Sequence, residues 1–282
     1  MADIWIISDG KPGHQNQSLG LAEALVELKP ELTFMIIPVE EAKYAFFSKS
    51  SPKLIISAGR ATHLWNWLLS LRYSAKNAVL MRPSLPYACF DCVLIPEHDK
   101  PMASDRIVAT KGAINRMKPA EKEIDSQIVL LGGPSKHVKW DSDAVLQEII
   151  NLSAGSSLPL RVAVSRRTPA SLLDTLKLLE HVVLIKPDAV ANDWLPQTLS
   201  TTDRVVVSSD SVSMVYESLT AGCTVSLIRL KSTRKSRTQQ GVDVLLAKGL
   251  VGASANQLPA NPVSEFREAI RCADIILERF PL

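Results

Sequence analysis

The chain has 282 residues, of which 46% are hydrophobic and 22% are charged. This length predicts about two domains, and so high an apolar fraction excludes a mainly disordered chain. Lys and Arg total 32 against 29 Asp and Glu, so the net charge of +3 lacks the strong basic excess of a dedicated nucleic-acid binder.

Targeting and redox signals are weak in this sequence. No run of residues approaches the ~18 consecutive apolar positions of a membrane span, and the first ten residues match a buried strand better than a signal peptide. Four cysteines are too few for a disulfide scaffold of this size. Cys89 and Cys92 form a CxxC without a second pair at metal spacing, so we expect packing cysteines, no metal site and a cytoplasmic protein.

In the first half of the chain, short β-rich runs alternate with helical segments. Strands are predicted at 3–8, 33–39, 53–57, 78–81, 92–95 and 106–109, and helices at 16–29 and 60–72. This alternation predicts βαβ units, in which a parallel sheet is covered by helices on both faces.

The pattern restarts after a polar stretch at 116–126. Strands are predicted at 127–131, 160–164, 182–185, 204–208 and 225–230, and helices at 141–153, 211–221, 237–248 and 263–279. We therefore predict two Rossmann-like α/β domains with doubly wound parallel sheets, residues 1–120 and 121–282, the last helix being a candidate to pack back on the first domain. In such sheets ligands bind beyond the carboxyl ends of the strands, so we expect these ends to face a common cleft.

The first candidate loop, SDGKPGHQNQ, occupies residues 8–17 between the first strand and the first helix. Its glycines permit close approach of the backbone to a ligand, and the helix start offers free N–H groups to an anion. His14 and Asp9 are candidate proton-transfer groups, because histidine titrates nearest neutral pH. Further candidate contacts in this loop are Lys11, Gly13 and Gln17. The spacing matches neither a GxGxxG fingerprint nor a Walker loop.

Other strands of the first half also end in polar or cationic loops, with the sequences SAGR, RPS, PEHD and TKGAINR. The residues predicted to line the cleft or the acceptor site are Gly59, Arg60, Arg82, His98, Asn115 and Arg116. For Arg60, a surface position is about as frequent as phosphate or carboxylate binding. For His98, a solvated turn is the more frequent role.

In the second half of the chain, two predicted strands are followed by polar loops, which have the sequences LGGPSKH and SRRTP. The first predicts a phosphate cradle built from Gly132, Gly133, Ser135 and Lys136. Two adjacent arginines, Arg166 and Arg167, are costly to bury and suit a diphosphate, although a surface ion pair readily accounts for one of them.

The segment SSDSVSMVYESLTAG at 208–222 joins a strand to a helix. Ser211 and Ser213 are candidate helix caps whose neighbouring N–H groups remain for phosphate. Glu217 is positioned one to two turns into the helix to accept hydrogen bonds from ribose hydroxyls. Gly222 is placed to end the helix.

The segment 229–237 holds five basic residues and no acid. Such a run suits an acceptor's phosphates or an anionic membrane surface, and a solvated basic loop is the more frequent meaning.

Over nearly the whole chain, an ordered set of motifs resembles the mitochondrial-fission ELM family. In chain order these motifs are SDGKPGHQNQ, ISAGR, RPS, PEHD, TKGAINR, LLGGPSKH, SRRTP and SSDSVSMVYESLTAG. Bacterial members of that family are described as glycosyltransferases and sometimes as nucleoside-diphosphate-sugar epimerases. The layout is also similar to GT-B glycosyltransferases of the MurG type.

The second resemblance implies roles for individual residues. His14 takes the general-base position, Gly133, Ser135 and Arg166 lie by the diphosphate, and Glu217 meets the ribose. Ser211 and Ser213 cap the helix. The first loop here is SDGKPGH rather than GGTGGH, and GGPS replaces GGSQG, so the sugar and the acceptor do not carry over.

The resemblance implies an inverting, metal-independent glycosyltransferase that uses a nucleotide-diphosphate sugar in bacterial cell-surface glycan synthesis. Its expected partners are the nucleotide sugar and a lipid-linked or surface-glycan acceptor, with no cofactor and no nucleic acid. Peripheral contact with the inner membrane is expected through 229–237. Two alternatives stay open: a non-catalytic fission-type interaction protein that keeps the fold, and a nucleoside-diphosphate-sugar epimerase.

Overall fold

The computed structural model describes residues 2–135, 138–155, 158–191, 193–232, 237–262 and 266–282. It forms two compact units. Unit 1 comprises Met1–Arg116 and Arg267–Leu282, and unit 2 comprises Met117–Phe266. Within the described residues, no helix is both long and apolar enough to cross a bilayer.

Unit 1 is built on a six-stranded sheet in the order β2-β1-β3-β4-β5-β6, in which every pairing is parallel. Its strands are β1 (Ile4–Ser8), β2 (Phe34–Pro38), β3 (Leu54–Ala58), β4 (Lys76–Leu80), β5 (Cys92–Pro96) and β6 (Ile107–Thr110). Its helices are α1 (Pro12–Leu28), α2 (Ala42–Ala45), α3 (His63–Tyr73) and α9 (Glu268–Arg279).

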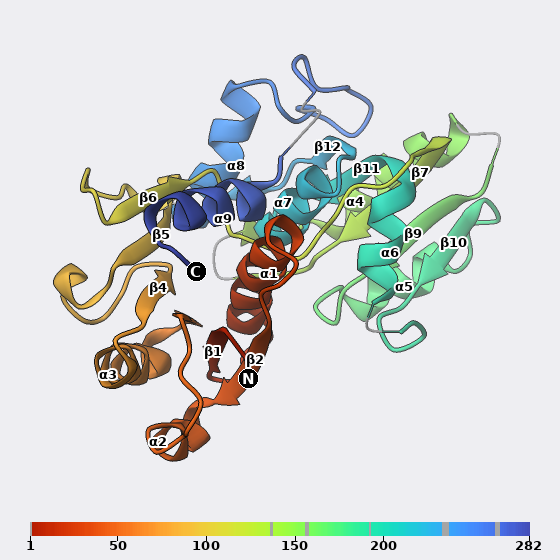
Figure 1. Cartoon of the computed structure of the whole chain (residues 1–282). Helices are drawn as coiled ribbons and strands as arrows, with labels where there is room; N and C mark the ends of the chain where they lie inside the picture. Colours follow the sequence, from red (N-terminus) through yellow and green to blue (C-terminus); the bar gives the residue numbers. More distant parts are fainter. Residues whose placement is uncertain (1, 136–137, 156–157, 192, 233–236, 263–265) are drawn as a thin grey trace. The chain divides into compact units, whose positions relative to one another are not determined.

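Alternate residues of the strands pack into two cores, because successive side chains of a strand point to opposite faces. Ile4 and Ile6 of β1 join the core formed with α1 and α9, whereas Trp5 and Ile7 join the core that contains Leu69 of α3. Figure 1 shows α9, in blue, beside α1, in red. The C-terminal helix therefore completes the cover of the N-terminal sheet.

Unit 2 is built on a five-stranded parallel sheet in the order β10-β9-β7-β11-β12. Its strands are β7 (Glu123–Leu131), β9 (Leu160–Val164), β10 (Val182–Ile185), β11 (Thr202–Ser208) and β12 (Thr224–Ile228), with a small antiparallel pair of β8 (Val138–Lys139) and β13 (Lys231–Ser232). Its helices are α4 (Ser142–Ala154), α5 (Ala170–Leu176), α6 (Trp194–Thr201), α7 (Val212–Thr220) and α8 (Arg237–Ala247).

The prediction of two doubly wound parallel-sheet domains is confirmed. In each unit the first strand has later strands on both sides of it, β2 and β3 beside β1 and β9 and β11 beside β7. At the strand where the winding changes direction, the neighbouring loops run to opposite faces of the sheet. This leaves room for a ligand at the carboxyl ends of the strands. The candidate loops after β1, β3, β7, β9 and β11 lie at these ends.

Several predicted boundaries are wrong for identifiable reasons. The first helix begins at Pro12 rather than at residue 16, because proline suits the first helical position, where no intrahelical N–H bond is needed. Strand β7 begins at Glu123, inside the predicted linker, because its exposed polar end still pairs with β11 at Thr202. The last helix begins at Glu268 rather than at 263, after Phe266 is buried in the core of unit 2. The short helices α2 and α6 were not predicted.

Candidate functional site

A histidine and a buried carboxylate form a dyad at the carboxyl end of the unit 1 sheet. Nδ1 of His14 lies 2.9 Å from Oδ2 and 3.1 Å from Oδ1 of Asp9. The Asp9 side chain is 5% exposed, and the imidazole is 26% exposed. Because a carboxylate only accepts, Nδ1 carries the proton and Nε2 keeps a lone pair for a substrate proton.

Local structure holds this dyad in place. His14 lies in the first turn of α1 rather than in an open loop. Gly59 is held at φ +91°, and a Cβ there would collide with the His14 ring and with Asp9, so only glycine fits. Burial raises the pKa of Asp9, but hydrogen bonds from His14 and from the Lys11 N–H outweigh burial and lower the pKa below the usual value. Asp9 is therefore the charged partner that orients His14.

The remaining predicted residues of the first loop are mostly exposed. Lys11 reaches Oδ2 of Asp9 at 3.6 Å, and the Gln17 amide donates to the Gly13 carbonyl and to the Met81 sulfur. Gly13 has no neighbour within 4 Å of where a Cβ would lie. Gly13 is therefore not needed for packing.

The predicted cationic residues of unit 1 differ in whether they already bind another group of the protein. Arg60 is exposed and has no carboxylate partner within the described part of the chain. Arg82 donates to the Asp99 carbonyl at 2.8 Å. His98 lies in the 3₁₀ turn Glu97–Asp99 directly after β5. Arg60 is accordingly available to an anion at this edge.

Asn115 and Arg116 serve the packing of unit 1. The Arg116 guanidinium makes a bidentate pair with Glu23 of α1, with contacts of 2.6 to 3.1 Å. Gly20 of α1 packs directly against the Asn115 carbonyl, where a Cβ would not fit. Both residues fasten the end of the unit to α1.

His63 is a buried polar residue in unit 1 that sequence reasoning did not select. Its Nδ1 accepts from the Ser84 N–H at 3.0 Å and lies 2.9 Å from the Ser84 hydroxyl, while its Nε2 is buried without a partner in the described residues. Burial, together with the nearby His14, lowers the pKa of His63, so the ring stays neutral. No motif spacing pointed to this pair, because Ser84 follows a different strand.

In unit 2, the loop after β7 is fixed by a buried carboxylate. The Asp210 side chain is fully buried, and its Oδ2 accepts from the Gly133 N–H at 2.9 Å and from Arg167 at 3.0 Å. Its Oδ1 accepts from the Ser208 hydroxyl at 2.7 Å. A Cβ at Gly132 would collide with Asp210, and one at Gly133 would collide with the Arg167 backbone. These glycines are thus required for packing within the protein.

The two adjacent arginines have different roles. Arg167 donates to the Gly133 carbonyl as well as to Asp210, so it clamps the loop. Arg166 is exposed and forms no ion pair within the described ranges. Only Arg166 is therefore available to a ligand.

A pocket of about 430 Å³ lies beside Arg166, beyond the ends of β7, β9 and β10. Its apolar wall includes Ile185, Pro187, Trp194 and Met214. Ligand sites are typically concave and apolar with a few polar groups, and Ser165, Arg166 and Lys186 supply such groups here. Sequence reasoning missed these wall residues, because they come from separate elements: Ile185 ends β10, Pro187 follows it, Trp194 begins the unpredicted helix α6, and Met214 lies on α7.

The start of α7 differs from expectation. Ser211 is the N-cap residue, but no side chain caps the helix, so the prediction that Ser211 and Ser213 do so is wrong. Within the described residues, no side chain accepts a hydrogen bond from the first N–H groups of α7, and the Ser208 hydroxyl is engaged by Asp210 instead. Gly222 follows the helix with φ +79°, as predicted.

Glu217 lies in the middle of α7 and is partly buried. Within the described residues its carboxyl group accepts no hydrogen bond, and burial raises its pKa to about 7.

We expect Glu217→Gln to remove a pH-dependent loss of stability. The folded protein binds the Glu217 proton more tightly than the unfolded chain, so stability is full below about pH 4.5 and falls as the pH rises to about 7. The loss is about 2 kcal/mol for a partly exposed carboxyl. Urea unfolding of both proteins across this pH range measures the loss. A free energy of unfolding that depends on pH in the same way for both proteins would contradict the assignment.

Two predicted features fall outside the described residues. Lys136 lies there, beside Ser135, which is exposed. Residues 233–236 of the basic segment 229–237 lie there too, while Lys231 belongs to β13.

Comparison with known proteins identifies the family of the chain. A family model described as mitochondrial fission ELM1 matches residues 12–280. The chain belongs to this family. The uncharacterized protein RP120 of Rickettsia prowazekii is 23% identical over 287 residues, which cover 78% of this chain and 81% of RP120.

Solved structures similar to this ELM1-family chain share its fold at low identity. A Listeria monocytogenes protein assigned as a UDP-N-acetylglucosamine 2-epimerase has a TM-score of 0.58 at 10% identity, covering 99% of this chain and 88% of its own. A glycotransferase of kitacinnamycin has a TM-score of 0.54 at 12% identity, covering 99% of both chains. S. aureus MnaA with UDP has a TM-score of 0.52 at 12% identity, covering 99% of this chain and 89% of its own. The chain has the two-domain GT-B fold of such proteins.

Proposed function

We propose that this ELM1-family protein transfers a sugar from a nucleoside-diphosphate sugar to an acceptor hydroxyl. The observation that carries the proposal is the pocket of unit 2, where an apolar wall ends at the unpaired cation Arg166. A nucleoside offers a flat, weakly polar base next to an anionic diphosphate, so it matches both parts of this pocket.

Unit 1 supplies the base in this proposal. The acceptor hydroxyl oxygen attacks the anomeric carbon while Nε2 of His14 takes its proton. The bond from that carbon to the diphosphate oxygen breaks, and the nucleoside diphosphate leaves with the electron pair. One displacement inverts the anomeric centre. Asp9 holds the imidazole and stabilises the cation that forms on it.

Unit 2 holds the leaving group. Its negative charge grows as the glycosidic bond breaks, and Arg166 and the uncapped N–H groups of α7 are suited to stabilise it. These groups supply the positive charge that a metal ion supplies in other transferases. We therefore expect transfer to continue in the presence of a chelator.

Binding of uridine diphosphate tests the donor half of this proposal. We expect it to raise the melting temperature of the wild-type protein, because a ligand that binds only the folded state stabilises it. Arg166→Ala should weaken binding about tenfold or more, since a charge-assisted bond to phosphate is lost. Lys177→Ala, which removes an exposed cation paired with Asp174, is the matched control and should bind normally.

The outcomes separate the candidate functions. No thermal shift with any nucleoside diphosphate would support a non-catalytic interaction protein. Binding followed by a changed sugar configuration without acceptor would identify an epimerase. Transfer that requires an acceptor supports the proposal.

A further inference from the structure

A buried histidine holds a serine at the same edge of the unit 1 sheet as the His14–Asp9 dyad. His63 is 2% exposed and begins α3, while the exposed Ser84 follows β4. Because the Ser84 N–H donates to Nδ1 of His63 at 3.0 Å, this nitrogen is an acceptor and Nε2 carries the proton. The Ser84 hydroxyl lies 2.9 Å from the same nitrogen and donates to it as well. The Ser84 oxygen therefore offers its lone pairs to a ligand.

The His63–Ser84 pair is costly to the protein, which indicates a role beyond packing. Nε2 of His63 is a buried donor without a partner in the described part of the chain, and an unmet donor destabilises a fold. The loop that carries Ser84 starts at Met81, whose φ of +69° is uncommon for a residue with a side chain. Strained backbone and unmet polar groups cluster at functional sites. Both costs are borne here to hold one exposed hydroxyl.

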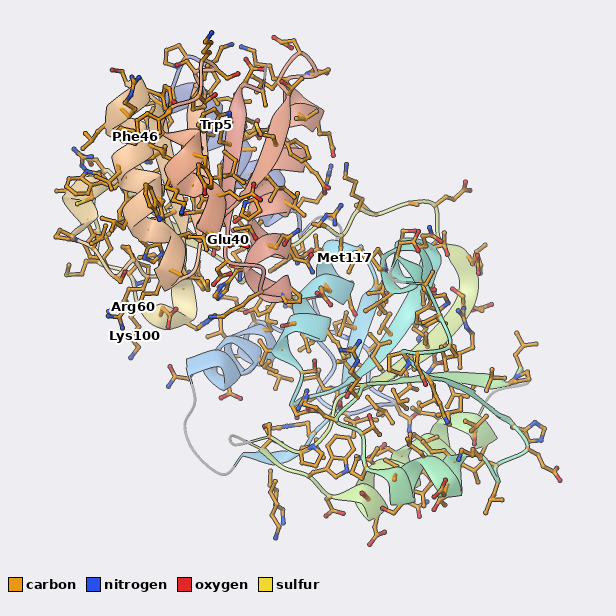
Figure 2. All side chains as sticks on the ribbon, turned by 90° about the horizontal axis from the view of Figure 1, so that it is seen from below. Trp5, Glu40, Phe46, Arg60, Lys100 and Met117 are labelled. Carbon is orange, nitrogen blue, oxygen red and sulfur yellow. The ribbon has the colours of Figure 1, made fainter. Side chains whose placement is uncertain are left out.

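The 3₁₀ turn before α3 connects this pair to the dyad and to a cation. Gly59 lies against the His14 ring. Its carbonyl accepts from the N–H and the hydroxyl of Thr62, which precedes His63. Arg60 follows Gly59, is exposed and has no ion pair within the described ranges, and Figure 2 shows it at the rim of unit 1. A base, a hydroxyl and a cation therefore lie close together at this edge.

We infer that Arg60 and Ser84 bind the acceptor of the proposed transfer, and that this acceptor is a saccharide with an anionic group. The inference rests on the proposed role of His14 as the base. A guanidinium binds phosphate or carboxylate through paired hydrogen bonds, and a serine oxygen whose proton is already engaged meets a hydroxyl of the ligand. A saccharide with its reacting hydroxyl at His14 has further hydroxyls on neighbouring carbons for Ser84. An acceptor with a single isolated hydroxyl satisfies neither residue.

His63 is a positioning residue in this site, because it acts through Ser84. Burial and the charge of His14 lower the pKa of His63, so its ring stays neutral and keeps the Nδ1 lone pair for Ser84. His14 is the opposite tautomer, since its Nδ1 donates to a carboxylate and its Nε2 keeps the lone pair. The two histidines therefore differ in a property that nitrogen chemical shifts report.

Titration of the full-length protein with glucose, glucose 6-phosphate and glucuronate tests the inference. Isotope-labelled histidine makes the His14 resonance a reporter of binding, and the His14→Ala variant assigns it. We expect both anionic sugars to bind about tenfold or more tightly than glucose, since a charge-assisted bond is added. Arg60→Gln should remove this difference and leave glucose binding unchanged. Arg72→Gln, which removes an exposed cation at the other end of α3, is the matched control and should bind as the wild type does.

A double-mutant cycle tests the role of His63. Ser84→Ala should weaken binding of all three sugars about fivefold, because one hydrogen bond is lost. His63→Phe should do the same in the wild type and have no further effect in Ser84→Ala, since His63 acts only through Ser84. Nitrogen chemical shifts should place the proton on Nδ1 of His14 and on Nε2 of His63. Unchanged melting temperatures verify that all variants are folded.

The outcomes separate this inference from the proposed function. Glucose that binds as tightly as the anionic sugars, or an Arg60→Gln variant that still prefers them, would overturn the inference. So would additive effects of Ser84→Ala and His63→Phe, or no sugar binding at all. Uridine diphosphate that binds while no sugar does overturns this inference alone. The reverse result overturns the transfer proposal and supports a binding site for anionic saccharides.

Discussion

Replacing His14 by alanine is expected to lower kcat for sugar transfer by about 10²–10⁴, the usual contribution of a general base. The acceptor hydroxyl would then lose its proton only to water. Binding of uridine diphosphate should stay unchanged, since His14 belongs to unit 1 and the proposed donor pocket to unit 2. Single-turnover transfer and equilibrium binding, measured on the same preparation, separate the two effects.

Asp9→Asn provides the matched test of the dyad. The asparagine side chain keeps the shape but offers an uncharged amide, so the imidazole loses its fixed tautomer, and we expect kcat to fall by about 10²–10⁴. Transfer by the His14→Ala variant at the wild-type rate would falsify the assignment of the base. Loss with His14→Ala but not with Asp9→Asn would remove Asp9 from its orienting role.

The second large effect is expected for Asp210→Ala, which should lower the free energy of unfolding of unit 2 by about 3 kcal/mol. The variant leaves the Gly133 N–H and the Ser208 hydroxyl without their acceptor in a buried site, and Arg167 without its counter-charge. Hydrogen exchange of the β7 and β11 amides, followed by mass spectrometry, reports on this unit by itself.

Asp188→Ala removes an exposed aspartate of the same unit and should leave exchange unchanged. Protection of β7 in Asp210→Ala equal to that of the wild type would show that the loop does not depend on the clamp. A faster exchange in unit 1 would instead point to general damage.

Much of the fold was predictable, because strand and helix signals in this chain are strong. Buried runs such as IWIIS in β1 are apolar on both faces, which is what a covered parallel sheet requires. The helices missed, α2 and α6, are short and have few turns in which periodicity can show. The start of α1 was predicted four residues too late, because the only sequence signal for it is the proline at the first helical position, Pro12.

The site was predictable where chemistry is local in sequence. Asp9 and His14 are five residues apart, so both were selected from the same predicted loop. The distinction between Arg166 and Arg167 was not predictable, because it depends on Asp210, which is 43 residues from Arg167. The pocket wall at Trp194 and Met214 likewise comes from separate helices that meet only in the folded unit.

The return of α9 to the first sheet constrains the order in which the protein is made. Cys272, Ala273 and Ile276 complete the core that α1 begins, yet the ribosome synthesises them only after all of unit 2. The second unit can therefore finish folding while the apolar surface of α1 is still uncovered. A nascent chain halted between the two would hold a complete unit 2 and an unfinished unit 1, which makes that interval the period of greatest exposure to chaperones and proteases.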